Sequence, residues 1–235
     1  GIRDFILDPK HKLYDPDKPI GLDPRSVTFA EILLESGYRT GLIGKWHLGD
    51  WTVAGHRDYH PTNHGFEYFM GLTGGGSTPD HPLLEKQGTV RRFNGLTTDI
   101  LTDEAISFVN GDPSKPFLLC LNYRAPHARW LPVADEDWAP YADMVPVLPD
   151  PDYPDLDAEL MMQKMREYLA SISGVDRNVG RLLQTLIDLK LDANTVVIFT
   201  SDHGYNMGHN GIHHKGNGAW ATKTLPEPTP NIASK

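Results

Sequence analysis

Three short segments of this sequence bring lysine, histidine and aspartate together, and each one follows a run of apolar residues. The first is Gly44-Lys45-Trp46-His47, the second is Arg124-Ala125-Pro126-His127, and the third is Ser201-Asp202-His203-Gly204. Lysine and imidazole groups can bind a tetrahedral oxyanion and protonate a leaving oxygen. A carboxylate beside an imidazole can ligate a divalent ion. No segment alone is specific, but together they indicate a site for an oxyanion.

Lys45 and His47 lie two residues apart. In extended backbone, side chains at this spacing point to the same side, so the pair would present a fixed cation and a titratable donor together. The alternative is an ordinary surface lysine next to a structural histidine. Gly44 and Gly49 favour the first interpretation, because glycine lets the backbone approach a ligand closely.

His127 and the pair formed by Asp202 and His203 have structural alternatives as well. Pro126 restricts the backbone before His127 and so holds the imidazole in a defined direction, but a hydrogen-bonded loop histidine fits equally well. The alternative for Asp202 is a helix cap or a turn residue. Two ligands do not define a metal site, so further ligands would have to come from other parts of the polypeptide.

More imidazoles and a lysine follow the third segment. His213, His214 and Lys215 fit either a second metal-binding tract or a cationic loop that binds an anion. His209 is interpreted as an ordinary loop histidine. The tract therefore adds Lys215 to the candidate cations of the site.

Apolar runs upstream of the three segments predict the strands that position them. Strands are expected at 38–43, 116–122 and 194–200, and helices at 26–36, 98–109 and 156–189. The strands lack alternating polar residues, which is typical of strands buried on both faces of a parallel sheet. The pattern predicts an α/β fold with a mostly parallel sheet flanked by helices. Ligands bind beyond the carboxyl ends of such strands, so we expect the three segments to converge on one crevice.

Local signals refine this outline. Thr28 and Glu31 fit a capping box at the start of the first helix, and Gly37 fits its end. Residues 50–95 are rich in glycine, histidine and proline and show little periodicity, so we expect a long irregular excursion there.

The composition narrows the classes of function. The chain has 235 residues and a formal net charge of -9, which argues against a nucleic-acid partner. No run of about 18 apolar residues occurs, so no membrane-spanning helix is expected. The single cysteine, Cys120, excludes an intrachain disulfide and a cysteine-based zinc cluster. Because Cys120 lies inside a predicted strand and no Gly-x-Ser-x-Gly motif occurs, the sequence offers no evident nucleophile.

The same segments, in the same order, resemble the type I sulfatases of the alkaline-phosphatase-like superfamily, over nearly the whole chain. The resemblance is carried by SVTFAEILLESGYRTGLIGKWHLG at 26–49, NHGFEYFMG at 63–71, NGLTTDILTDEAISFV at 94–109, PFLLCLNYRAPH at 116–127 and VVIFTSDHGYNMGHNGIHHK at 196–215. The combination of the Gly-Lys-Trp-His-Leu-Gly and Thr-Ser-Asp-His-Gly stretches is specific. The resemblance implies an alkaline-phosphatase-like fold.

The resemblance implies roles for four basic residues. Lys45 and His47 match residues that contact a modified nucleophile and the sulfate group. His127 and Lys215 match residues that hold the sulfate and assist departure of the alcohol oxygen. The implied reaction is therefore hydrolysis of a sulfate ester.

The resemblance also implies a metal ion and a modified nucleophile. Asp202 and His203 match two ligands of a divalent ion, usually calcium, with magnesium as a second candidate. The nucleophile would be a formylglycine, made from cysteine or serine in a Cys/Ser-x-Pro/Ala-x-Arg signature. Its hydrate attacks sulfur and releases the alcohol, and sulfate then leaves as the aldehyde re-forms.

The sequence departs from the family at both ends. The formylglycine signature and an early Asp-Asp metal pair do not occur, and both are expected upstream of Gly1. A smaller C-terminal subdomain is also missing. We therefore expect residues 1–235 to be a partial sulfatase catalytic domain that is inactive by itself.

Two other functions stay open at this point. A phosphonate or phosphate ester hydrolase of the same superfamily would use the same cations, and a non-catalytic degenerate relative belongs to a different class. By resemblance, the substrate would be a small-molecule or glycan sulfate ester, and the protein would be periplasmic, secreted or lysosomal. Trp46, Arg129 and Trp130 hint at sugar or aromatic contacts, although Arg129 and Trp130 fit a stacked surface pair equally well. Oligomeric state is not indicated.

Overall fold

A computed structural model describes residues 21–49, 57–72, 74–212, 219–220 and 229–230. Lys215, together with His213 and His214, lies outside the described residues. Within them, a five-stranded sheet has the order β4-β3-β2-β1-β5. Its strands are β1 (Arg39–Lys45), β2 (Tyr68–Leu72), β3 (Leu83–Lys86), β4 (Thr89–Arg92) and β5 (Phe117–Asn122). Two-residue strands, β6 (Ala219–Trp220) and β7 (Thr229–Pro230), pair separately.

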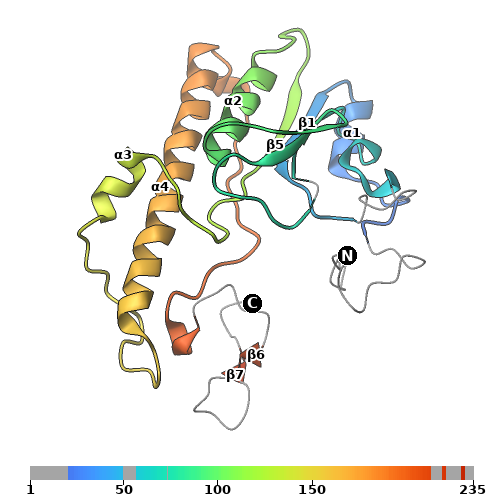
Figure 1. Ribbon diagram of the computed structural model, residues 1–235. Helices are drawn as coiled ribbons and strands as arrows, with labels where there is room; N and C mark the ends of the chain where they lie inside the picture. Colours follow the sequence, from blue (N-terminus) through green and yellow to red (C-terminus); the bar gives the residue numbers. More distant parts are fainter. Residues whose placement is uncertain (1–20, 50–56, 73, 213–218, 221–228, 231–235) are drawn as a thin grey trace.

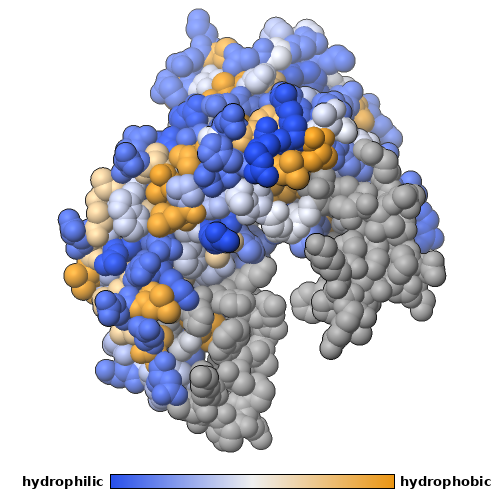
Figure 2. All heavy atoms as spheres, in the orientation of Figure 1, coloured by the Kyte–Doolittle hydropathy of each residue, from blue (hydrophilic) through white to orange (hydrophobic). Residues whose placement is uncertain are grey.

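Helices flank this sheet, as the alternating pattern predicts (Figure 1). The α-helices are α1 (Phe29–Glu35), α2 (Thr97–Val109), α3 (Asp135–Trp138) and α4 (Ala158–Asp188). Short 3-10 helices are η1 (Arg57–Tyr59), η2 (Pro61–Asn63), η3 (Ala139–Tyr141), η4 (Asp192–Asn194) and η5 (His209–Gly211). Hydrophilic residues predominate on the face seen in Figure 2, and apolar residues form separate patches there.

The central strand β1 divides the core into two layers, because successive side chains of a strand face opposite sides of a sheet. Leu42 packs with Ala30 of α1, and Ile43 packs with Leu101 and Ala105 of α2. Strand β1 is parallel to both neighbours, β2 and β5. The predicted parallel core and its covering by helices on both faces are therefore confirmed.

The region predicted to be an irregular excursion contributes β2, β3 and β4, so that expectation is wrong. Strand β3 pairs antiparallel with both β2 and β4, which makes the whole sheet mixed. The β3–β4 connection consists of Gln87 and Gly88, both with positive φ, as a two-residue hairpin turn of type I′ requires. Strands of four or five residues between glycines and prolines give too short a pattern for periodicity to detect.

The first helix has the predicted ends. The Glu31 amide donates to Thr28 Oγ1 at 3.2 Å, and the Thr28 amide donates to Glu31 Oε2 at 2.6 Å. Gly37 follows the helix with φ of +87°. The Thr28 hydroxyl also donates to the His64 carbonyl, which ties α1 to the segment before β2.

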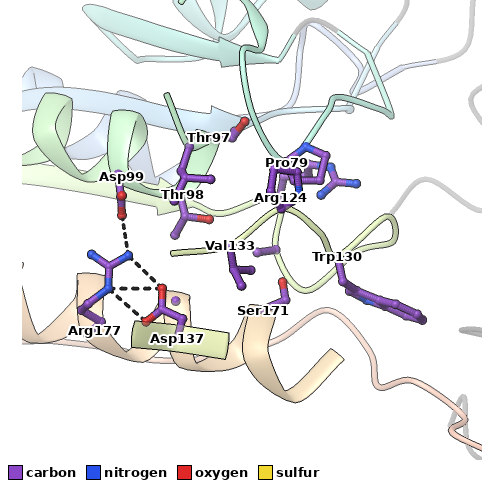
Figure 3. A pocket seen from close by; sticks show the side chains of 14 residues that line it. Pro79, Thr97, Thr98, Asp99, Arg124, Trp130, Val133, Asp137, Ser171 and Arg177 are labelled. Atoms are coloured by element: carbon purple, nitrogen blue, oxygen red, sulfur yellow. Dashed lines mark hydrogen bonds and ion pairs between the residues drawn. The ribbon is translucent and has the colours of Figure 1, made fainter. Parts of the chain in front are cut away.

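The long helix α4 is joined to α2 and α3 by one arginine. Arg177 Nη2 lies 3.0 Å from Asp99 Oδ1 and 2.9 Å from Asp137 Oδ2 (Figure 3). Asn178 also donates to Asp99. The hydrogen bonds that Arg177 donates to Asp137, followed by the nearby Asp99 charge, raise the pKa of Arg177. Because Asp137 is only 4% exposed, this ion pair holds the three helices together in the protein interior.

The strand predicted at 194–200 does not form. Residues 195–200 lie outside helices and strands, and Val196, Val197, Ile198 and Phe199 are 57–86% exposed. No described strand pairs with this segment, and an apolar run becomes a buried strand only where a neighbour accepts its hydrogen bonds. Strand β5, which ends the described sheet, is likewise half-buried instead of buried on both faces.

Trp46 belongs to the core. It is 9% exposed, its ring lies 5.8 Å from the His64 ring, and its Nε1 donates to the Tyr59 carbonyl at 2.8 Å. His64 is fully buried, and neither of its ring nitrogens has a hydrogen-bond partner of good geometry among the described residues. Burial lowers the pKa of His64, while Glu31 opposes the shift. His64 therefore packs against Trp46 as a neutral ring.

Replacing Gly44 by alanine should destabilise the protein more than replacing Gly37. Both glycines have positive φ, so alanine costs about 1 kcal/mol at either site. Only at Gly44 would the new Cβ lie 1.9 Å from a backbone oxygen, that of Asn122. Beyond the cost that both sites share, we expect Gly44→Ala to lower the free energy of unfolding by about 1–3 kcal/mol, measured by urea denaturation. Equal losses would contradict the close approach.

Replacing His64 by phenylalanine should flatten the pH dependence of stability. The unfolded chain protonates His64 below about pH 6.5, whereas burial keeps the folded pKa lower. The free energy of unfolding therefore falls as the pH falls from 6.5 towards the folded pKa. His64→Phe should reduce that fall in denaturation curves recorded at several pH values. The control His81→Gln removes an exposed histidine and should leave the slope near that of the wild type.

Candidate functional site

The carboxyl ends of β1 and β5 lie side by side. Gly44 pairs with Asn122 in parallel register, and Asn122 Nδ2 donates to the Lys45 carbonyl at 3.0 Å. Gly44 has φ of +113°, and its Cα approaches the Asn122 carbonyl too closely for any side chain. The segment with Lys45 and His47 and the loop with His127 therefore leave the sheet at the same edge.

Lys45 is the last residue of β1 and is half-buried. His47 has φ of +49°, so the extended backbone of β1 does not continue to it. The two-residue spacing from Lys45 therefore does not determine the side to which the His47 side chain points. Its ring lies against Gly75, where an added Cβ would come within 2.7 Å of His47 Cε1. The loop around Gly75 thus forms part of the His47 environment.

Three hydrogen bonds shape the loop that carries His127. The His127 amide donates to the Arg124 carbonyl at 2.9 Å, and Trp130 Nε1 donates to the Pro126 carbonyl at 2.8 Å. The third runs from Arg124 Nη1 to the Arg129 carbonyl at 2.7 Å. These bonds hold the loop in one conformation after β5.

The imidazole of His127 has a defined tautomer in its neutral form. Its Nδ1 lies 2.8 Å from the Ala128 carbonyl oxygen, which can only accept a hydrogen bond. Nδ1 therefore carries the proton. Nε2 is then the nitrogen that can exchange a proton with a ligand, which suits a general acid or base.

Asp202 and His203 lie together on an exposed segment. Asp202 Oδ2 is 3.4 Å from His203 Nε2, and the Asp202 side chain is 82% exposed. His203 Nδ1 donates to the Gly204 carbonyl at 3.0 Å, which leaves Nε2 as the potential ligand atom. The pair fits one side of a divalent-ion site. Among the described residues, no group of three or more histidine, cysteine, aspartate or glutamate side chains could hold an ion.

A cluster of aromatic rings connects this segment with the His127 loop. The Tyr205 ring lies 5.7 Å from the Trp130 ring and 5.6 Å from the Tyr168 ring on α4. Trp130 is only 6% exposed, so it is a packing residue and does not form a surface pair with the exposed Arg129. Neither Trp130 nor the buried Trp46 offers an open ring face to a sugar.

The structure thus brings some of the candidate residues together. Lys45, His47 and His127 follow neighbouring strand ends, and the segment with Asp202 and His203 passes beside the His127 loop through Tyr205. Lys215 lies outside the described residues. Sequence reasoning assigned no role to Asn122 or Arg124, although both stand in the quoted PFLLCLNYRAPH stretch. No sequence signal distinguishes such a buried or bridging side chain from a surface one.

A small cavity lies between the His127 loop and helices α2, α3 and α4 (Figure 3). Its lining residues include Thr97, Arg124, Asp137, Ser171 and Arg177. The space is about 20 Å³, enough for a single water molecule and too small for a substrate. This cavity is therefore not a substrate-binding pocket.

Cys120 is not a reactive group in this structure. It lies within β5, and burial raises the pKa of its thiol to about 11. A thiol of this kind remains protonated at neutral pH and is a poor nucleophile. This agrees with its interpretation as a packing residue.

None of the helices in the described parts of the chain combines the length and apolar character needed to cross a membrane.

The family model for the sulfatases matches residues 8–225. A curated relative from Escherichia coli, described as the uncharacterized sulfatase YdeN, is 32% identical over 203 residues, covering 77% of this chain and 33% of the relative. N-acetylglucosamine-6-O-sulfatase from Bacteroides thetaiotaomicron is 26% identical over 262 residues, covering 78% of this chain and 45% of that protein. The chain thus spans between a third and a half of the length of these two relatives.

A solved structure has the same fold. It is the protein BT4656 in complex with its substrate D-glucosamine-2-N,6-O-disulfate, and it matches with a TM-score of 0.69 at 23% identity over 83% of this chain and 53% of that one. The likeness bears out the alkaline-phosphatase-like architecture expected from the sequence, although the described sheet is mixed. With the family model matched along most of its length, this chain belongs to the sulfatase family.

Proposed function

We propose that the protein carrying this chain hydrolyses sulfate esters. The observation that carries the proposal is the common edge at which Lys45, His47 and the His127 loop leave neighbouring parallel strands. Membership of the sulfatase family supports the same reaction. Cationic and imidazole donors gathered there can neutralise the oxygens of a sulfate group.

His127 is the residue that we propose as general acid. Its Nδ1 is engaged by the Ala128 carbonyl, so a proton on Nε2 is the one available to the departing alcohol oxygen. Lys45 and His47 hold the sulfate oxygens, and Lys215, outside the described residues, would join His127. A formylglycine elsewhere in the whole protein would supply the attacking oxygen.

We also propose a divalent ion, calcium or magnesium, held in part by Asp202 and His203. Both side chains are exposed, and Asp202 Oδ2 and His203 Nε2 face each other at 3.4 Å. When bound, the ion would withdraw charge from the sulfate oxygens. Because calcium and magnesium prefer oxygen ligands, the imidazole is a minor part of the shell, and the other ligands must be mainly oxygens.

The substrate class that we propose is a sulfated sugar. Two similar proteins support this choice, the N-acetylglucosamine-6-O-sulfatase and the protein solved with a glucosamine disulfate. From membership of the sulfatase family, we also propose that the protein acts in the periplasm, in the lysosome or as a secreted protein.

The full-length protein should hydrolyse 4-nitrophenyl sulfate faster than 4-nitrophenyl phosphate. His127→Ala should lower kcat/KM for phenyl sulfate, whose poor leaving group needs the proton, about a hundredfold. The control is His209→Ala, which alters an exposed histidine of η5 and should retain activity. Preference for the phosphate would favour the phosphatase alternative. Equal losses in the two variants would show that the site is misplaced.

Removing divalent ions with a chelator should abolish turnover by the full-length protein, and calcium or magnesium should restore it. Asp202→Asn should raise the ion concentration needed for half-maximal rescue about tenfold or more. The matched control is Asp143→Asn, another exposed aspartate. Thermal unfolding with and without calcium gives a second reading, in which Asp202→Asn should lose the calcium-dependent rise in Tm. Unchanged metal dependence in Asp202→Asn would contradict the assignment.

A further inference from the structure

Arg124 is a buried cation at the start of the loop that carries His127. The residue is 6% exposed, and its Nε has no hydrogen-bond partner among the described residues. None of the ion pairs formed within the described parts of the chain includes it. Burial lowers the pKa of Arg124, and the nearby cation Arg129 lowers it further. Burying a guanidinium without a carboxylate is unfavourable, so a packing role alone would be served better by methionine.

What distinguishes Arg124 from an apolar residue is its pair of contacts with the loop. Its Nη1 donates to the Arg129 carbonyl at 2.7 Å, and its own carbonyl accepts the His127 amide at 2.9 Å. One residue therefore fixes both the start and the end of the segment that carries the imidazole. No other described side chain donates to the Arg129 carbonyl.

The contact with Arg129 reaches the imidazole through two successive peptide units, which meet at the Arg129 Cα. His127 Nδ1 is oriented by the Ala128 carbonyl, and that carbonyl belongs to the peptide that joins Ala128 to Arg129. The Arg129 carbonyl belongs to the next peptide, which shares the Arg129 Cα, so holding it limits rotation at Arg129 and thereby steadies the peptide on which the imidazole depends. If the peptide turned, Nδ1 would lose its acceptor, and Nε2 would lose its fixed direction.

We propose that Arg124 is a positioning residue that aims His127 Nε2 at the leaving oxygen of the substrate. The inference rests on the proposed function, because it assigns Arg124 to the proton-transfer step of ester cleavage. In that step the attacking oxygen of the nucleophile bonds to sulfur, the bond between sulfur and the bridging oxygen breaks, and the proton on Nε2 passes to that oxygen, which leaves the imidazole neutral. Arg124 contacts neither substrate nor reacting atoms.

Leaving-group dependence separates this role from a purely structural one. A 4-nitrophenolate leaves readily without a proton. A phenolate is a poorer leaving group, so its departure depends more strongly on proton donation. In the full-length protein, Arg124→Met should lower kcat for phenyl sulfate about tenfold to a hundredfold more than kcat for 4-nitrophenyl sulfate, with little change in KM. Arg124→Lys should recover part of the loss, because an ammonium group can still donate to the Arg129 carbonyl.

The matched control is Arg166→Met. Arg166 also has a buried Nε without a partner and donates through Nη1 to a backbone carbonyl, that of Met144, at 3.2 Å. It lies on α4 and has no contact with the His127 loop among those described. Arg166→Met should change both kcat values equally or not at all. Urea denaturation of each variant checks that it is folded.

Two further measurements complete the test. On a His127→Ala background, Arg124→Met should add no leaving-group-dependent loss. Nitrogen NMR of the imidazoles should show His127 protonated at Nδ1 in the wild type and in mixed tautomers in Arg124→Met. Equal losses on both esters, or an unchanged tautomer, would overturn the proposal. If the wild type cleaves no sulfate ester, the proposed function fails, and the NMR result still decides whether Arg124 orients the imidazole.

Discussion

Parallel pairing of β1 with β5 brings the Gly44 backbone so close to the Asn122 carbonyl that no side chain fits between them. This approach aligns the two strand ends, and Asn122 then reaches the Lys45 carbonyl with its side-chain amide. Everything assigned to the carboxyl edge of the sheet depends on that alignment. A shift of one residue would move Lys45 away from the His127 loop and reverse the faces on which the core packs.

Local signals predicted the parts of the fold that are determined by neighbours in sequence. The start of α1 follows from its capping box. The extents of α2 and α4 and the positions of β1 and β5 follow from the spacing of apolar residues. The pairing of β3 and β4 and the exposure of Val196–Phe199 depend on which strands lie alongside, and no local pattern records that. The run at 194–200 has the composition of a buried strand but lacks a described partner.

The site also combines features that local sequence predicts with features that depend on distant segments. The cationic and imidazole residues were identifiable from their types and spacing after apolar runs, and the structure brings Lys45 and the His127 loop to one edge. The role of Arg124 was not identifiable, because burial of a guanidinium arises from packing between distant segments. Likewise, the sequence hinted that Trp46 and Trp130 contact a sugar. The structure excludes this, because both rings are buried in aromatic clusters.

The exposed run Val196–Phe199 has a consequence for how this polypeptide behaves in solution. Four consecutive exposed apolar residues outside any described strand are the kind of segment that adds to the open edge of another sheet. Strand β5 ends the described sheet and offers such an edge. The exposed run and the edge of β5 are therefore places at which this chain is expected to pair with another strand.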